Sequence, residues 1–352
     1  MTNPQVIAID AMGGDHGPSV TIPGVARAAR LLEGRNVRFL LCGDEARIAA
    51  QLGRSKRIAD LCDIRHSDLV ISSDDPPAQA MRRGKGSSMW NAVEAVKNGE
   101  AIAAVSSGNT GALMAISKLL LRMAADLDRP AIVASWPSMH GSTTVLDVGA
   151  NVGCDAERLV DFAIMGEAFH RAVHAVPRPT VGLLNIGSED QKGHEELREA
   201  HAILRDGGLP IDYRGFVEGT DISSGVVDVV ITDGFTGNVA LKTAEGTARF
   251  IGSEMRAAFT SGLMSKLGAL IANQALKKLK HRLDPNTVNG GPLLGLNGVV
   301  VKSHGGANDE GFANAILVAA DVAQSRFADE IHANMQQLMT VLAHPPAAGE
   351  VS

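Results

Sequence analysis

The sequence has little of several features that define other classes of protein. Aromatic residues make up 3% of its 352 residues, with Tyr213 as the single tyrosine, so few rings are present to stack on single-stranded nucleic acid. The formal net charge of −6 argues against a broadly basic nucleic-acid binder. The three cysteines, Cys42, Cys62 and Cys154, form no C-x-x-C pair and indicate no disulfide framework. We therefore expect a cytoplasmic protein that binds no nucleic acid.

Several targeting and cofactor signals are also missing. Residues 1–4 lead directly into a predicted strand with no signal-peptide pattern, and no apolar run is long enough to cross a bilayer. The sequence has no Cys/His cluster, no H-E-x-x-H, and neither of the two glycine-rich nucleotide signatures. It also has no G-x-S-x-G nucleophile elbow. We expect no metal and no cofactor, and any membrane contact must be peripheral.

What is present is an alternation of short aliphatic runs with longer segments of helical apolar spacing. The predicted strands are Val6–Asp10, Val37–Gly43, Ala101–Ser106, Ala131–Ser135, Thr143–Asp147, Thr180–Asn185 and Val226–Asp233. The predicted helices include Val20–Leu32, Ser88–Lys97 and Leu159–Val173. This order predicts an α/β fold, a three-layer α/β/α sandwich with a mostly parallel sheet. We expect one α/β catalytic domain over residues 1–344 and a flexible tail over residues 345–352.

Two predicted strands in the first third of the chain end in glycine-rich turns, where open α/β sheets bind ligands. Their glycines, hydroxyls and amides precede helix starts and suit an anion. The alternative is that these side chains only cap the helices that follow. The candidate binding residues in these turns are Asp10, Gly13, Gly14, Ser107, Asn109 and Thr110, and His16 lies beside them.

Four later turns have the same character. Asn151 could donate to a carbonyl or form an Asx-turn, and Lys192, close to Asn185, could meet phosphate or be a solvated surface lysine. Asp233 and Asn238 form a small anion cradle. His304, after a run of valines, could titrate near neutrality or be structural. The pattern predicts an anionic ligand at a sheet edge.

Together these turns are more specific than any one of them. The strings IDAMGGDHGP (9–18), SGNTGALM (107–114), LDVGANV (146–152), LLNIGSEDQKG (183–193), VVITDGFTGNVALKTAEG (229–246) and LLGLNGVVVKSHG (293–305) occur in that order. The chain thereby resembles the phosphate acyltransferases of phospholipid synthesis, the PlsX family, over about residues 5 to 340. Ser107 stands where an alanine is usual, and Gly305-Gly306-Ala307 where serines are more usual, which puts specific roles for those side chains in doubt.

The resemblance implies transfer of a fatty acyl group from acyl-acyl-carrier protein to inorganic phosphate, giving acyl phosphate. It also implies a homodimer whose fold is similar to isocitrate dehydrogenase and phosphotransacetylase. Phosphate is itself the nucleophile in this reaction, so no activated serine or cysteine is needed. Lys192 is the predicted cation near phosphate and thioester, and Asp233 and Asn238 orient it or the nucleophile. His16 is predicted to move a proton or to stabilise charge.

Residues 255–285 differ from the rest of the chain. Leu263, Leu267, Leu270 and Ile271 follow helical spacing, and a basic, leucine-containing stretch with Lys277 and Lys278 comes next. A basic amphipathic helix of this kind lies in the interface of an anionic membrane. The same stripe could instead be buried in a dimer arm, or the basic stretch could dock the acidic carrier protein. We expect peripheral membrane contact, because acyl phosphate is used at the membrane by a further acyltransferase.

Two other functions remain open at this point. An NAD-dependent decarboxylating dehydrogenase of related fold would need substrate-binding arginines and clustered metal-binding aspartates, and the sequence offers no clear arrangement of either. A non-catalytic membrane scaffold would leave the polar turns unexplained.

Overall fold

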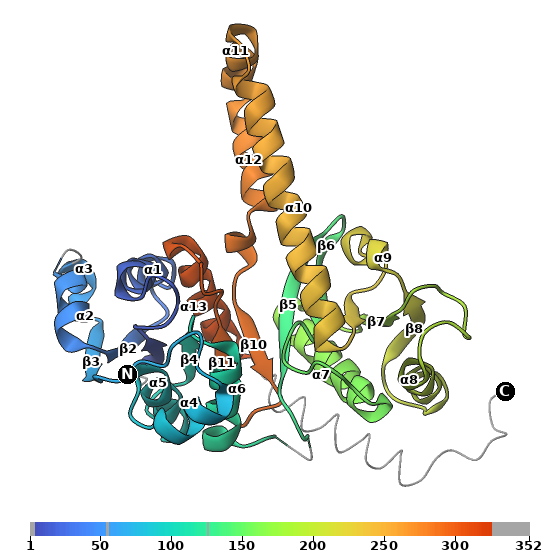
Figure 1. The fold of residues 1–352 in the computed structure, drawn as a ribbon, viewed down its shortest axis with the longest axis horizontal. Coiled ribbons are helices and arrows are strands. Elements are labelled where there is room, and N and C mark those ends of the chain that lie inside the picture. Colours follow the sequence, from blue (N-terminus) through green and yellow to red (C-terminus); the bar gives the residue numbers. More distant parts are fainter. Residues whose placement is uncertain (1–3, 54–55, 125–126, 326–352) are drawn as a thin grey trace.

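The computed structural model describes residues 4–325 except 54–55 and 125–126 (Figure 1). The tail expected over residues 345–352 and the last part of the expected domain, residues 326–344, lie outside the described residues.

The described residues form a continuous 11-stranded sheet. Its strands, in spatial order, are β3 (Cys62–His66), β2 (Val37–Gly43), β1 (Gln5–Asp10), β4 (Ala103–Ser106), β11 (Val299–Lys302), β10 (Gly291–Leu294), β5 (Ala131–Ser138), β6 (Gly141–Leu146), β9 (Val229–Ile231), β7 (Thr180–Leu184) and β8 (Asp212–Val217). The seven strands expected from aliphatic runs all form. The run of valines before His304 forms an eighth expected strand, β11. Strands β3, β8 and β10 were not predicted, because they are short or polar.

The sheet consists of two parallel blocks that run in opposite directions. Strands β3, β2, β1, β4 and β11 pair in parallel, and so do β6, β9, β7 and β8. Between them, β10 is antiparallel to both β11 and β5, and β5 is antiparallel to β6. The mostly parallel sheet is therefore confirmed, but the carboxyl ends of the two blocks lie at opposite edges.

Helices cover both faces of each block, because alternate strand residues point to opposite faces. In the first block, Ile7 and Ile9 pack under helices α1 (Pro18–Leu31) and α13 (Asp309–Gln324), whereas Ala8 faces α5 (Ser88–Lys97) and α6 (Thr110–Leu121). In the second block, α7 (Ala156–His174) and α8 (Glu195–Asp206) cover one face and α9 (Gly219–Ser224) packs on the other. The three-layer α/β arrangement expected from the sequence is confirmed. The shorter helices are α2 (Glu45–Leu52), α3 (Lys56–Ala59), α4 (Pro77–Arg83) and the 3-10 helix η1 (Pro285–Val288).

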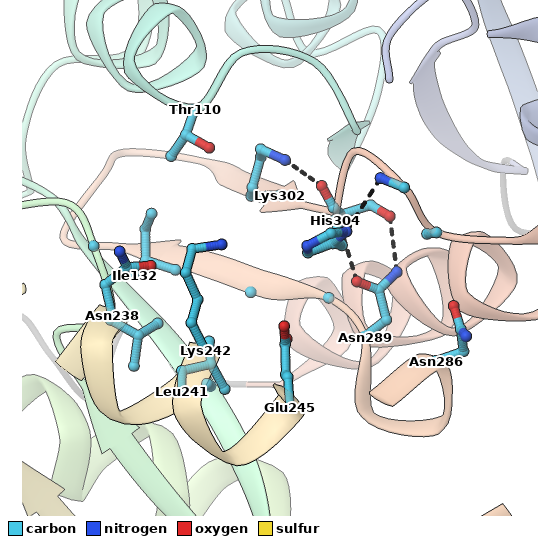
Figure 2. A pocket seen from close by; sticks show the side chains of 18 of the residues that line it. Thr110, Ile132, Asn238, Leu241, Lys242, Glu245, Asn286, Asn289, Lys302 and His304 are labelled. Atoms are coloured by element: carbon cyan, nitrogen blue, oxygen red, sulfur yellow. Dashed lines mark hydrogen bonds between the residues drawn. The ribbon is translucent and has the colours of Figure 1, made fainter. Parts of the chain in front are cut away.

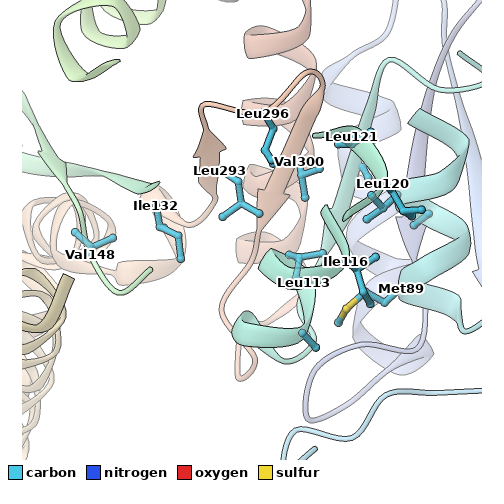
Figure 3. Close-up of a cluster of buried hydrophobic side chains, with 14 of the residues drawn as sticks. Met89, Leu113, Ile116, Leu120, Leu121, Ile132, Val148, Leu293, Leu296 and Val300 are labelled. Carbon is cyan, nitrogen blue, oxygen red and sulfur yellow. The ribbon is translucent and has the colours of Figure 1, made fainter. Parts of the chain in front are cut away.

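A buried apolar cluster joins the two blocks at the antiparallel junction. Leu113 and Ile116 of α6 pack in the same cluster as Leu293 of β10, Val300 of β11 and Ile132 of β5 (Figure 3). Fully burying an aliphatic side chain of this size contributes about 1.5–3 kcal/mol. The cluster therefore fixes how the strand ends of one block face the other.

One long helix leaves the body and forms an arm. Helix α10 (Gly234–Thr260) continues into α11 (Leu263–Ile271) at the tip, and α12 (Asn273–Leu283) returns beside it (Figure 1). At 1.5 Å per residue, α10 is about 40 Å long. The side chains of Leu263, Leu270 and Ile271 are 87%, 71% and 81% exposed, and Leu267 is 52% exposed. This confirms the projecting amphipathic segment, and Lys277 and Lys278 are exposed on α12.

Candidate active site

Three strand-end turns of the first block are packed directly against one another. The Ser106 hydroxyl donates to Asp10 Oδ2 at 2.7 Å, and the Asp15 amide donates to the Gly305 carbonyl at 3.0 Å. Gly14 has a φ of +79°, and a Cβ there would lie 2.7 Å from Ser107 Oγ. Only a glycine fits such a contact in this backbone conformation. The turns after β1, β4 and β11 therefore form one rigid junction.

A cavity of about 560 Å³ lies beside this junction, over the place where the two blocks meet. Helix α10 forms one wall with Asn238, Leu241, Lys242, Glu245 and Arg249. The start of β5, Val148 and Gly149, residues 284–291 and the end of β11 form the rest, with Thr110 at the start of α6. Figure 2 shows the α10 side chains pointing toward the strand-end segment that carries Lys302 and His304.

Two lysines from different elements bring positive charge to this cavity. Lys302 ends β11 and is partly buried, and its Nζ donates to the Ser303 carbonyl. Burial and, to a smaller extent, the charge of Lys242 lower the pKa of Lys302 to about 8. The carboxylates of Asp10 and Asp15 oppose this shift. An anion bound beside Lys302 would stabilise the charged form of this lysine and bring its pKa back toward the ordinary value.

The loop that carries His304 is held in place by Asn289. The Asn289 amide donates to Ser303 Oγ at 2.8 Å and to the Gly311 carbonyl at 2.7 Å, and its Oδ1 accepts from the His304 amide at 2.9 Å. His304 Nδ1 accepts from the Gly306 amide at 3.1 Å. In the neutral ring this places the proton on Nε2, so that His304 is a donor.

Of the predicted binding residues, Thr110, Asn238 and His304 line the cavity. Asp10, Gly13, Gly14 and Ser107 form the adjoining junction. Burial raises the pKa of Asp10, and the hydrogen bond from Ser106 opposes this shift. A Cβ at Gly13 would lie 2.6 Å from Asp10 Oδ2, so this part of the site leaves no room for larger side chains.

Three predicted amides have partners within the fold. Asn109 caps α6 by accepting from the Ala112 amide at 3.0 Å, and its Nδ2 donates to the Ser73 and Asp75 carbonyls. Asn151 is 1% exposed and donates to Asp147 and to the Pro130 carbonyl. Asn185 donates to the Lys192 carbonyl at 3.1 Å. Each amide therefore holds a turn in shape.

The predicted catalytic residues do not line this cavity. Asp233 caps α10 by accepting from the amide and hydroxyl of Thr236, and it faces a separate shallow cavity with His194. Lys192 is exposed in the loop after β7, and His16 is exposed after β1. Asp233 and Lys192 follow strands of the second block, whose carboxyl ends lie at the other edge of the sheet. Neither lines the cavity that Thr110 and His304 share, and their catalytic roles stay predictions.

Sequence reasoning overlooked Lys302 and Lys242 as binding residues. The available signal was a lysine directly after the Val299–Val301 run, at the strand end where a ligand is expected. Lys242 follows Asn238 by one helical turn, which places both on one face of α10.

Neither a metal site nor a membrane-spanning helix is found in the part of the chain that the structure describes. No group of three or more His, Cys, Asp or Glu side chains is arranged there to hold a metal ion. The helices found there are all too short or too polar to cross a bilayer.

Comparisons with known proteins agree on one family. A family model described as fatty acid synthesis protein matches residues 5–330. A phosphate acyltransferase of Caulobacter vibrioides is 65% identical over 343 residues, covering 97% of this chain and 95% of its own length. That of Phenylobacterium zucineum is 63% identical over 348 residues, covering 99% and 98%.

Solved structures show a similar fold. A phosphotransacetylase from Streptococcus pyogenes matches with a TM-score of 0.59 at 16% identity, covering 91% of this chain and 94% of its own. A branched-chain phosphotransacylase from Enterococcus faecalis matches with a TM-score of 0.56 at 12% identity, covering 91% and 99%.

Proposed function

The chain belongs to the fatty acid synthesis protein family, and on this premise we propose that it transfers a fatty acyl group from an acyl-carrier-protein thioester to inorganic phosphate. Its relatives are named phosphate acyltransferases, which supports acyl transfer over hydride transfer or a non-catalytic scaffold. The product is an acyl phosphate for phospholipid synthesis.

The observation that carries this proposal is the pair of lysines at one cavity. Lys302 from β11 and Lys242 from α10 line the cavity from different elements, together with the His304 and Thr110 donors. Two cations and a set of neutral donors suit a dianion such as phosphate. Bound phosphate would also reduce the cost of burying the Lys302 charge.

The chemistry requires no nucleophile from the protein. All three cysteines belong to the described residues, none lines this cavity, and burial raises the pKa of each thiol to about 12. A phosphate oxygen attacks the thioester carbonyl carbon, and the tetrahedral oxyanion accepts hydrogen bonds from site donors. The C–S bond then breaks, and the proton of hydrogen phosphate goes to the departing thiolate. The products are acyl phosphate and the free carrier-protein thiol.

Lys192, Asp233 and His16 stay predictions for this reaction. Asp233 lines a second cavity, with His194, which would suit contact with the carrier protein or a role after a rearrangement of the loops. His16 lines a small cavity with Gly13, Ser107 and Gly305 at the junction of the turns. The role first given to Lys192, as the cation beside phosphate, is filled in our proposal by Lys302 and Lys242.

Membrane contact through the arm is part of the proposal. The exposed apolar stripe of α11, with Leu263, Leu267, Leu270 and Ile271, lies at the end farthest from the sheet (Figure 1). Lys277 and Lys278 on α12 add charge that attracts anionic lipid. The same arm would support homodimer contacts, and the acyl phosphate would pass to a membrane acyltransferase.

Release of carrier-protein thiol from palmitoyl-carrier protein tests the function directly. We expect release to require inorganic phosphate, and hydroxylamine to trap the acyl product as a hydroxamate. Thiol release that is equal without phosphate would indicate a thioesterase. No release from a folded protein at any phosphate concentration would contradict the proposal.

A further inference from the structure

Three neighbouring cations lie on the surface between helices α4 and α5. Arg82 and Arg83 end α4, and Lys85 follows them in the turn before α5. All three side chains are exposed, and none of them forms an ion pair or a hydrogen bond with another residue that the structure describes. The chain has no acidic residue between Asp75 and Glu94. We call Arg82, Arg83 and Lys85 the basic cluster.

Large apolar side chains are exposed beside the basic cluster. Leu69, Val70 and Met81 are 51%, 47% and 37% exposed, and Met81 belongs to α4 itself. The Leu69 carbonyl accepts from the Ser88 amide at 3.1 Å, which holds the loop after β3 against the start of α5. Exposed apolar and cationic side chains in one patch are typical of a surface that binds another protein.

Helix α4 is anchored at the wall of the cavity of about 560 Å³. The helix begins at Pro77, and a Cβ at Gly111 would lie 2.7 Å from the Pro77 Cγ. Gly111 directly follows Thr110, which lines the cavity, and Figure 1 shows α4 beside α6. The Asn109 amide donates to the Asp75 carbonyl at 3.0 Å and so fixes the chain just before the helix. One end of α4 therefore touches the cavity wall, and the other end carries the basic cluster.

The length of α4 suits the delivery of a thioester by a carrier protein. The seven residues of the helix span about 10 Å along its axis. A carrier protein holds its acyl group at the end of a flexible prosthetic group that is as long as about five extended residues, roughly 17 Å. A carrier bound at the basic cluster can therefore reach the cavity beside Thr110 with its thioester.

The charge of the basic cluster distinguishes it from the other candidate surfaces. The chain has a formal net charge of −6, so an acidic partner needs a local region of positive charge. The shallow cavity beside α8 is lined by Asp155, Glu196 and Asp233, whereas the basic cluster presents three free cations. Lys277 and Lys278 are exposed as well, but they lie on the arm that carries the proposed membrane and dimer contacts. An acidic carrier protein therefore matches the basic cluster best.

A structural role accounts for part of the basic cluster. Cations in the last turn of a helix stabilise it through the helix dipole, which applies to Arg82 and Arg83. Asp68 and Asp74 are exposed in the loop before α4 and reduce the local positive charge. Neither observation explains the free charge of Lys85 or the exposed apolar side chains beside it. The attraction to an acidic partner should be sensitive to salt, because the charges on both sides are exposed.

We propose that the basic cluster, together with Leu69 and Met81, is the docking surface of the acidic carrier protein that brings the acyl donor. The inference rests on the proposed function and adds the place where its protein partner binds. Charged residues at the rim of an interface act mainly on the rate of association and on its salt dependence. Loss of these charges should therefore raise KM for the carrier-bound donor and leave kcat and KM for phosphate nearly unchanged.

Arg82→Glu/Arg83→Glu tests the docking surface by reversing two charges. With palmitoyl-carrier protein as donor at low ionic strength, we expect KM for the donor to increase about tenfold or more, while kcat and KM for phosphate change less than about twofold. Arg82→Gln/Arg83→Gln removes the charges without reversing them and should give a smaller increase. Added salt should raise the wild-type KM and bring the wild type and the variants closer together.

The matched control places the same change in charge at the opposite edge of the sheet. Arg30, near the end of α1, and Lys97, at the end of α5, are both exposed. These helices lead to the amino ends of β2 and β4, whereas α4 lies beside the carboxyl ends of the same block. Arg30→Glu/Lys97→Glu should keep the wild-type KM for palmitoyl-carrier protein. Binding of unacylated carrier protein, measured without turnover, should weaken in Arg82→Glu/Arg83→Glu and not in the control.

Several results would overturn the inference. An unchanged KM for palmitoyl-carrier protein in Arg82→Glu/Arg83→Glu would remove the basic cluster as the docking surface, and so would an equal increase in the control. A lower kcat with an unchanged KM would give these arginines a role in the reaction step instead. Lost flotation with anionic lipid vesicles, with carrier binding unchanged, would assign the cluster to the membrane. Carrier binding that depends on the cluster, in a wild-type protein that forms no acyl phosphate, would refute the proposed function and leave the docking surface standing.

Discussion

Removing the charge of Lys302 should weaken phosphate use and stabilise the fold at the same time. Lys302 lies beside the junction of three turns, and burial lowers its pKa from 10.5 to about 8. This shift corresponds to a loss of at most about 3.5 kcal/mol in the free energy of unfolding while the lysine is charged at neutral pH. Lys302→Met keeps the apolar stem and removes the charge, so its free energy of unfolding should rise.

The dependence on pH follows from the lowered pKa. Below about pH 8 both the folded and the unfolded protein hold the proton, and the destabilisation is fully present. Between about pH 8 and 10.5 the folded protein releases the proton first, and the destabilisation disappears. The stability gain of Lys302→Met should therefore be largest below pH 8, and it should vanish as the pH rises toward 10.5.

Activity should respond in the opposite direction. A hydrogen bond from a charged donor contributes about 1.5–3 kcal/mol, so kcat/KM for phosphate should fall roughly 10- to 150-fold in Lys302→Met. In the wild type, kcat/KM for phosphate should fall as the pH rises through the pKa of Lys302 in the free enzyme. Lys302→Arg, which stays charged, should shift that fall to higher pH.

Phosphate titrations of thiol release at several pH values, with denaturant unfolding beside them, measure both effects. Lys97→Met, at the exposed end of α5, is the control for loss of one positive charge. A wild-type kcat/KM for phosphate in Lys302→Met would contradict the contact between Lys302 and phosphate. A loss of stability at pH 7 would contradict the proposed cost of the lysine charge, because the buried charge would then have a stabilising partner.

Three further predictions concern the turns and the arm. Gly14→Ala should lower the melting temperature, since a φ of +79° and a contact of 2.7 Å with Ser107 Oγ cost about 1–3 kcal/mol, and an unchanged melting temperature would show that the junction relaxes. Lys192→Ala tests the cationic role predicted from the sequence: because Lys302 and Lys242 fill that role in our proposal, kcat/KM for phosphate should stay near the wild-type value, and a decrease of about tenfold or more would return Lys192 to the phosphate site. Replacing both Leu263 and Leu267 by glutamate should abolish flotation with anionic lipid vesicles, and unchanged flotation would remove this segment as the membrane contact.

The sequence was sufficient for the local elements but not for their relative direction. Runs such as Val6–Asp10 and Thr180–Asn185 are aliphatic enough to identify strands, and the alternation with helical spacing indicates a parallel sheet. Strand β10 is four residues long and begins with Gly291 and Pro292, so its apolar pattern is too short to recognise. That strand, with β5, reverses the direction of half of the sheet.

The reversal explains which candidate residues come together. Strand-end residues of one parallel block meet at one edge, so Thr110 and His304 could be grouped from sequence order and general α/β rules. Lys192 follows a strand of the other block and does not line this cavity, and its predicted role at the phosphate site stays a prediction.

Helix α10 restores a connection between the two edges. It starts after β9 in the second block, and its side chains from Asn238 to Arg249 line the cavity that ends at Lys302 in the first block. The chain thus places one cation of the pair on the sheet and the other on a helix that continues into the arm. Because that helix also carries the arm, any shift of α10 would move Lys242 and the arm together. A single helix would then determine both how phosphate is held and where the tip of the arm lies.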